Sequence, residues 1–362
     1  EKMGSGRQTQ VIDRLERILS RMDKKDSSWV PSNLRLADLL AERARLRFMN
    51  EIEENCKGCK GSEADRKQAL KLYEMIFKST RAETQGVILF QMAHLFEIAG
   101  DSNKAVSLYE GILKERKGRY PGDIVTRARV ALADVQFQKG EFKKSLATYR
   151  LAMADKKTEA KGLIQYRIAW CLFNLGQLNE AIKTLQDVAQ TPSLLTKETA
   201  QGSVHDSAFQ GDVLRDLATF YSRRPVSSND ISRFTKLLPQ DQRKELLYFF
   251  ADEVNRLGQK QAASEIYKSY LATPGLTQEE RLDVMVQIAQ VTYDKGQSSR
   301  SIEDFALAAQ AYKNTRCSDD EKCLDLQKRM KRYVTELHRS KKAQPDYDVV
   351  RAYDIYVKTF PE

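Results

Sequence analysis

The sequence predicts an all-α fold, an α-solenoid of stacked helix pairs. The first observation is a spacing that recurs five times: a small residue, a glycine seven positions later, and a second small residue five positions after the glycine. The second is that only 17 Gly and 8 Pro occur among 362 residues, as expected for long helices joined by short turns. Self-similarity at a fixed period indicates a repeat architecture. The five copies are Ala93, Gly100 and Ala105; Ala133, Gly140 and Ser145; Ala169, Gly176 and Ala181; Ala251, Gly258 and Ala263; and Ala289, Gly296 and Ser301.

The distances between these glycines define the period. Successive glycines are separated by 40 (100 to 140), 36 (140 to 176), 82 (176 to 258) and 38 (258 to 296) residues. The long step equals about two periods, so we expect one degenerate copy between Gln190 and Gln240.

One copy, Gln85–Gly118, explains the physics of all of them. Its apolar residues fall at helical spacing up to Gly100, which favours the left-handed conformation that ends a helix. Asp101 can cap the next helix. That helix presents the small residue Ala105 and, four positions later, Tyr109 on one side. A single pair cannot bury its apolar stripe alone, so neighbouring pairs must stack.

The segment before the first clear copy predicts a leading helix and one weaker pair. Val11–Met22 has apolar residues on one side and is interpreted as an N-terminal cap. Leu34–Glu54 predicts a helix, after which a Cys- and Gly-rich insertion, Asn55–Ser62, replaces the usual tight turn. Ala69 and Tyr73 then repeat the spacing of a second helix.

Two further weak copies are predicted in the middle and at the end of the chain. Gly202–Arg223 and Asp230–Leu238 form the degenerate pair. Leu324–His338 precedes Val349–Pro361, which fits the second helix of another copy. The apolar face of that last helix lacks a polar cap, so we expect the array to continue past Glu362 or to be covered by another molecule. The equal alternative is that Glu362 is an arbitrary boundary.

These spacings resemble the tetratricopeptide repeat (TPR), a helix-turn-helix of about 34 residues with small, Gly, small and aromatic positions. The resemblance implies a right-handed α-solenoid of about eight TPR-like helix pairs. It divides the chain into a capping helix (1–30), an N-terminal array of about four repeats (31–190), a degenerate repeat (191–240) and a C-terminal array (241–362).

The same resemblance implies a concave face that is lined by the first helix of each pair. Positions three before, one after and four after the first small residue would point into it. We therefore expect a partner to bind at Phe90, His94, Val130, Asp134, Phe137, Tyr166, Trp170, Phe173, Tyr248, Asp252 and Tyr293.

Two alternatives bear on this expected site. An aromatic stripe at helical spacing is more often core, so some of Phe137, Tyr166 and Phe173 could instead pack against the adjacent repeat. Trp170 fits that alternative less well, because other residues already fill the inward positions of its helix. TPR proteins that bind the C-terminal carboxylate of chaperones resemble one another in placing Lys and Asn along the groove. The corresponding positions here hold neither residue, so binding of a chaperone tail is not expected.

Four of the five cysteines form two local pairs in loops, Cys56 with Cys59 and Cys317 with Cys323. Such pairs are typical of stapled loops in an oxidising compartment. Free thiols and a zinc site remain as alternatives, although no His is placed to complete a metal site. The fifth cysteine, Cys171, is interpreted as a small buried hydrophobe. The disulfide interpretation favours a periplasmic location over a cytoplasmic one.

The sequence lacks the motifs of enzymes and of cofactor binding. No Gly-rich phosphate loop, His-Glu-x-x-His, EF-hand loop or nucleophile elbow occurs, so we expect no catalytic residues, no cofactor and no metal. The net charge of +10 is spread over short basic patches that mostly have acidic neighbours. This pattern makes nucleic acid an unlikely partner, because clustered charge without a recognition motif is only an electrostatic footprint. No apolar run is long enough for a transmembrane helix.

The resulting hypothesis is a non-catalytic scaffold that binds a protein or peptide on its concave face. The loop cysteines, the Leu34–Arg47 helix and the Tyr-x-x-Tyr-x-x-x-x-Pro pattern at 353–361 resemble those of long periplasmic TPR proteins of bacterial envelope, motility or secretion machines. The first alternative is a cytoplasmic regulatory adaptor that docks a small switch protein. The second is RNA binding by the basic patches.

Overall fold

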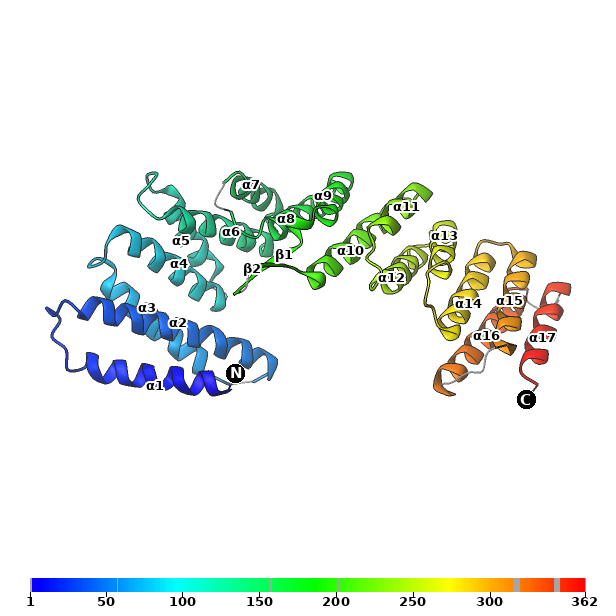
Figure 1. The fold of residues 1–362 in the computed structure, drawn as a ribbon, viewed down its shortest axis with the longest axis horizontal. Coiled ribbons are helices and arrows are strands. Elements are labelled where there is room, and N and C mark those ends of the chain that lie inside the picture. Colours follow the sequence, from blue (N-terminus) through cyan, green and yellow to red (C-terminus); the bar gives the residue numbers. More distant parts are fainter. Residues whose placement is uncertain are drawn as a thin grey trace. The chain divides into compact units, whose positions relative to one another are not determined.

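The computed structural model describes residues 2–56, 58–155, 158–200, 202–314, 320–341 and 346–361. In these residues the regular structure is helical, apart from one short β-hairpin (Figure 1). The chain divides into two compact units, residues 1–177 and 178–362. Each unit is a stack of helix pairs, so the all-α solenoid that the spacing predicts is confirmed.

The described residues of the first unit form eight helices. The leading helix α1 packs on α2, and the pairs α2/α3, α4/α5 and α6/α7 follow, with α8 packed on α7. First helices of successive pairs also touch, α2 with α4 and α4 with α6. The bounds are α1 Lys2–Leu19, α2 Trp29–Glu53, α3 Gly61–Phe77, α4 Ala82–Ile98, α5 Ser102–Lys114, α6 Gly122–Gln138, α7 Phe142–Met153 and α8 Lys161–Asn174.

The second unit begins with α9 and continues through a 3-10 turn and the hairpin into four helix pairs, α10/α11, α12/α13, α14/α15 and α16/α17. The degenerate pair α10/α11 lies where the long glycine step predicts it. The bounds are α9 Leu178–Gln190, η1 Pro192–Leu194, β1 Thr196–Thr199, β2 Gly202–His205, α10 Ser207–Ser222, α11 Ser228–Leu237, α12 Arg243–Arg256, α13 Lys260–Leu271, α14 Gln278–Asp294, α15 Ser298–Lys313, α16 Asp320–Ser340 and α17 Tyr347–Thr359.

The small residues of the repeat lie where the two helices of a pair meet. Ala133 and Ser145 are both completely buried. The Ser145 hydroxyl donates a 2.8 Å hydrogen bond to the carbonyl of Ala133 on the facing helix. Ser301 makes the same bond to Ala289 at 2.7 Å. A serine is therefore accommodated at this close contact, because the hydrogen bond of its hydroxyl offsets the cost of removing that hydroxyl from water.

The glycine that recurs at the same position of each repeat also has a geometric cause. Gly140 follows α6 with φ of 74°, and the equivalent Gly100, Gly176, Gly258 and Gly296 have φ of 75–80°. This left-handed conformation ends the first helix of the pair and is strained for a residue with a Cβ.

The largest differences from the sequence expectation are at the starts of α10, α1 and α2. Residues 202–206 were expected to be helical, but Gly202–His205 pairs with Thr196–Thr199 as an antiparallel strand, with Thr199 opposite Gly202. Helix α10 starts only after Asp206, whose carboxylate accepts from the Phe209 amide. Helix α1 also starts earlier and ends earlier than Val11–Met22, and α2 starts at Trp29 because its proline falls in the first turn, where no hydrogen bond is lost.

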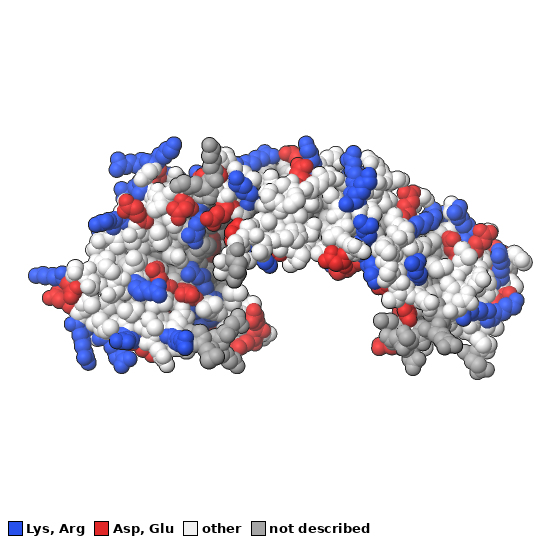
Figure 2. Space-filling model, viewed as in Figure 1, with Lys and Arg blue, Asp and Glu red and all other residues white. Residues whose placement is uncertain are grey.

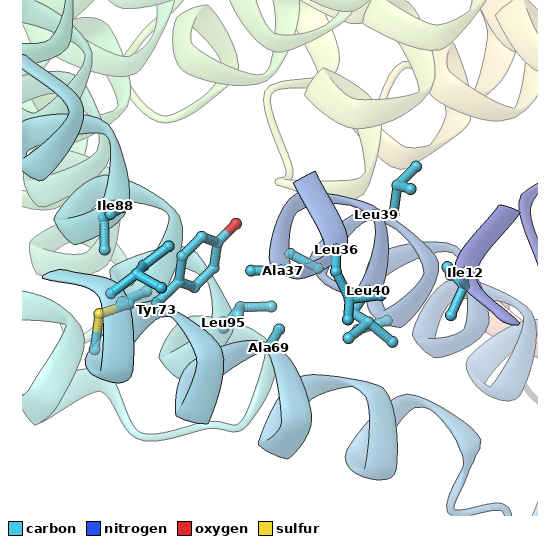
Figure 3. Packing of buried hydrophobic residues seen from close by; sticks show 13 residues of the cluster. Ile12, Leu36, Ala37, Leu39, Leu40, Ala69, Tyr73, Ile88 and Leu95 are labelled. Carbon is cyan, nitrogen blue, oxygen red and sulfur yellow. The ribbon is translucent and has the colours of Figure 1, made fainter. Parts of the chain in front are cut away.

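The leading helix covers the apolar side of the first pair. Ile12 of α1 is buried against Leu36 and Leu40 of α2. Figure 3 shows these two leucines between Ile12 on one side and Tyr73 of α3 on the other. Burial of a side chain of this size contributes about 1.5–3 kcal/mol, which stabilises the packing of α1 on α2.

Candidate functional site

A cavity of about 310 Å³ opens in the first unit beside helices α4, α6 and α8. It is lined by the first helices of consecutive repeats, together with Tyr149 of α7 and the loop that leads into α8. The lining residues are Phe90, His94, Asp123, Thr126, Arg127, Val130, Ala131, Asp134, Tyr149, Thr158, Glu159, Ala160, Leu163, Ile164 and Arg167. Four of the eleven residues that the sequence predicts for the site are among them: Phe90, His94, Val130 and Asp134.

Part of the cavity lining is apolar. Phe90 and Ile164 are 3% and 2% exposed, so they are part of the core and present only one edge to the cavity. Val130 is partly exposed, and Leu163 is 45% exposed. An exposed leucine beside a cavity is a place where a partner can bury apolar area.

Both arginines of the lining lie over aromatic rings of this chain. The guanidinium carbon of Arg127 is 4.6 Å from the centre of the Phe90 ring. That of Arg167 is 6.0 Å from the Phe137 ring. Cation–π contacts of this kind contribute about 0.5–1 kcal/mol at exposed sites and hold the planar group in place.

Asp134 is the central carboxylate of the cavity. It accepts a hydrogen bond from the Tyr149 hydroxyl, and its Oδ1 lies 3.9 Å from Nε of Arg167. Partial burial raises the pKa of Asp134 above its usual value, although Tyr149 and Arg167 act in the opposite direction. Burial therefore outweighs the two neighbours that favour the charged form of this carboxyl group.

His94 and Glu97 lie one helical turn apart on α4, next to the cavity. His94 Nδ1 is 2.8 Å from a carboxylate oxygen of Glu97. The imidazole ring also makes an edge contact with Phe90, with ring centres 4.6 Å apart. These contacts hold the imidazole in one orientation beside the cavity.

The other predicted site residues of the first unit do not line the cavity. Phe137, Tyr166, Trp170 and Phe173 are partly buried. The rings of Trp170 and Phe173 pack edge to face with centres 5.4 Å apart, and the Phe137 ring packs on Phe142 at 5.3 Å. These aromatic residues form a partly exposed surface on the first helices.

The predicted residues of the second unit have a different environment. Tyr248 donates a 2.9 Å hydrogen bond to Asp283, which also pairs with Arg329, so three consecutive first helices are connected by one network. Tyr293 packs against Tyr333 with ring centres 6.3 Å apart, and Asp252 is exposed. The nearby pocket between α14 and α16 is lined mainly by charged and amide side chains, which include Gln290, Asp294, Lys328 and Arg332.

Sequence reasoning missed several residues that the structure brings to the cavity. Asp123 and Arg127 lie on α6 seven and three positions before Val130, so they continue its inward stripe toward the helix start. Leu163 lies on α8 three positions before Tyr166. Extending the inward face of each helix by one or two turns would have found them. Glu159 comes from a loop and has no such periodic signal.

Three of the cysteines are disulfide-bonded in the described residues. Cys56 and Cys59 form a disulfide, and Cys171 is a buried free thiol. Cys323 is disulfide-bonded, and its predicted partner Cys317 lies outside the described residues. In the described part of the chain, no group of three or more His, Cys, Asp or Glu residues is placed to hold a metal ion.

Charge is mixed over the visible surface. In Figure 2, basic and acidic side chains alternate without a continuous basic stripe on the face shown. Among the described residues, no helix has the length and apolarity to cross a bilayer.

Comparison with known proteins gives a family and several solved structures of low similarity. Residues 86–196 match the family model described as tetratrico peptide repeat. No curated protein matches the sequence.

Among solved structures, the C-terminal part of a TPR repeat-containing protein from Cytophaga hutchinsonii is 12% identical. That alignment covers 81% of this chain and 98% of the other, with a TM-score of 0.45. MamA from Desulfovibrio magneticus is 16% identical over 55% of this chain and 93% of its own, with a TM-score of 0.37. YrrB, described as a TPR protein with an unusual peptide-binding site, is 16% identical over 62% and 92%, with a TM-score of 0.36. Residues 86–196 are therefore identified as tetratricopeptide repeats, and the helix pairs before and after them stack in the same way.

Proposed function

We propose that this protein is a non-catalytic scaffold that binds a segment of a partner protein on the surface formed by α4, α6 and α8. The observation that carries the proposal is the cavity on these helices. Its lining includes the exposed Leu163 and also Arg167, which lies over the ring of the partly exposed Phe137, and the partly exposed Trp170 follows on α8. Helical repeats use the surface of successive first helices for binding.

The dimensions favour a short segment as the partner. Packed helices lie about 8–10 Å apart, so three successive first helices span roughly 20 Å. An extended chain covers that distance with about six residues at ~3.3 Å each.

Tryptophan is enriched among residues that dominate binding energy, and truncation of such residues costs about 2 kcal/mol or more.

Selection from a phage-displayed library of random dodecapeptides, with synthetic peptides then titrated by fluorescence anisotropy, tests the proposal. Leu163→Asp should weaken binding at least tenfold, because it places a charge beside the apolar lining. Leu151→Asp is the matched control, since Leu151 is 62% exposed on α7 and does not line the cavity. If no peptide is enriched, or if both variants bind as the parent does, the proposal is wrong.

We further propose that the protein acts in an oxidising compartment, within a bacterial cell-envelope assembly that serves motility, secretion or envelope biogenesis. The Cys56–Cys59 disulfide and the disulfide-bonded Cys323 support this location over a cytoplasmic adaptor. Intact mass spectrometry of protein isolated from its own cells without reductant tests it. Each disulfide lowers the mass by two hydrogen atoms and blocks two alkylation sites, whereas four alkylated loop thiols would contradict the proposed location.

A further inference from the structure

The charges around the cavity indicate which partner chemistry it accepts. We propose, on the basis of the function above, that the cavity binds a bulky apolar side chain of the partner that stands next to a basic residue. The size of the cavity, its lining and the charged groups around it support this proposal.

The volume and the lining define the apolar part of the ligand. At about 310 Å³, the cavity is at the lower end of the range of small-ligand sites, ~300–1,000 Å³. One large aromatic or aliphatic side chain and the backbone beside it fit that volume better than a whole helix does. Phe90, Val130 and Ile164 offer apolar atoms, and a polar group placed against them would lose hydrogen bonds to water.

The arginines of the lining are already engaged by this chain. Arg127 lies over the Phe90 ring, and Arg167 lies over the Phe137 ring with its Nε 3.9 Å from Asp134. A carboxylate from a partner would compete with these contacts, and it would also approach the negative charge of Asp134.

The carboxylates are less well compensated. Asp123 and Glu159 are exposed, and neither forms an ion pair with another described residue. Three carboxylates and two guanidinium groups line the cavity, so the acidic side chains outnumber the arginines by one. Glu97 adds a further carboxylate next to Asp134. A Lys or Arg side chain, or a terminal amine, complements this arrangement, whereas an acidic residue does not.

A small-molecule titration tests the charge preference without a peptide ligand. The probes are 2-phenylethylammonium and 3-phenylpropionate, which share an aromatic ring and differ in charge. Binding is followed by NMR through the methyl groups of Val130, Leu163 and Ile164 in the full chain. The cation should bind with about a threefold lower Kd than the anion, since an exposed ion pair contributes about 0.2–1 kcal/mol. Its advantage should disappear at ~0.5 M salt.

A double variant identifies the groups that are responsible. Asp123→Asn with Glu159→Gln should remove most of the preference for the cation. Glu74→Gln on α3 should not, since Glu74 is exposed and lies outside the cavity lining. If the anion binds more tightly, if neither probe shifts these methyl groups, or if the double variant keeps the full preference, the inference is overturned. Peptides that are selected but carry Asp or Glu beside the apolar residue would also overturn it, while the proposed function would stand.

Discussion

The Tyr149 hydroxyl on α7 donates a hydrogen bond to the carboxylate of Asp134 on α6. Tyr73 on α3 makes the same contact with Asp38 on α2 at 2.7 Å. Tyr149 and Tyr73 follow the small residues Ser145 and Ala69 by four positions. Asp134 and Asp38 each directly follow an alanine. Both rings are completely buried. The ring that fills the core of the repeat therefore also orients a carboxylate on the surface of the first helices.

Removal of the charge of Asp134 should change the pH dependence of stability. The pKa of Asp134 is raised in the folded protein, so the folded state binds its proton more tightly than the unfolded state does. Its contribution to stability is therefore favourable at low pH and is lost as pH rises from the ordinary value of 3.8 through the higher folded value. Asp134→Asn retains an acceptor for Tyr149 and should flatten this dependence, measured as urea midpoints between acid and neutral pH. An unchanged profile would contradict the prediction.

The buried tyrosines should make the protein sensitive to alkali. Burial raises the pKa of Tyr333 to about 12, from 10.0 in the unfolded chain. The stabilisation is therefore complete below pH 10 and is lost as pH rises through the folded pKa. Each such tyrosine removes about 1.4 kcal/mol of stability per pH unit within that window.

Tyr333→Phe provides the control for the alkaline effect. Tyr333 is 1% exposed, and its hydroxyl contacts that of Ser301, which keeps its own bond to Ala289 in the variant. Urea unfolding at several alkaline pH values should show a shallower loss of stability for the variant than for the parent. An equal loss of unfolding free energy per pH unit in both proteins would show that Tyr333 does not contribute to the alkaline effect.

Truncation of the partly exposed aromatic residues should affect binding more than folding. The double variant Phe137→Ala with Trp170→Ala should bind the selected peptides more weakly, while its melting temperature changes little. Phe250→Ala is the contrasting variant, since Phe250 is completely buried and its loss should cost about 3–5 kcal/mol. A fall in melting temperature of the double variant as large as that of Phe250→Ala would assign Phe137 and Trp170 to the core.

Two glycines should respond to alanine with opposite signs. Gly140 has φ of 74°, so Gly140→Ala should destabilise the protein by about 1 kcal/mol, although no atom lies within 4 Å of the added methyl group. Gly111 lies inside α5 with equally open space and without a positive φ, so Gly111→Ala should stabilise by about 0.5–1 kcal/mol. Chemical denaturation of both variants measures the difference, and the same sign for both would refute the conformational explanation.

Local patterns predicted the elements better than the boundaries between them. The spacing of Ala133, Gly140 and Ser145 repeats because each helix pair satisfies the same packing requirement, so one copy predicts the others. The hairpin of Thr196–Thr199 with Gly202–His205 was missed. All of its residues are exposed, so it lacks the alternation of apolar and polar residues that marks a half-buried strand. The Cys56–Cys59 disulfide was one of three alternatives that the sequence left open.

The amino-acid sequence alone determined the helix pairs, their small contact residues and the buried tyrosines, because these follow from a period that is written along each helix. Only the tertiary structure decided which inward residues share a cavity. Phe90 is 3% exposed there, while Leu163, 73 positions later (90 to 163), is 45% exposed beside the same space. Their meeting depends on how three consecutive repeats and the loop before α8 pack together, and no local period encodes that packing.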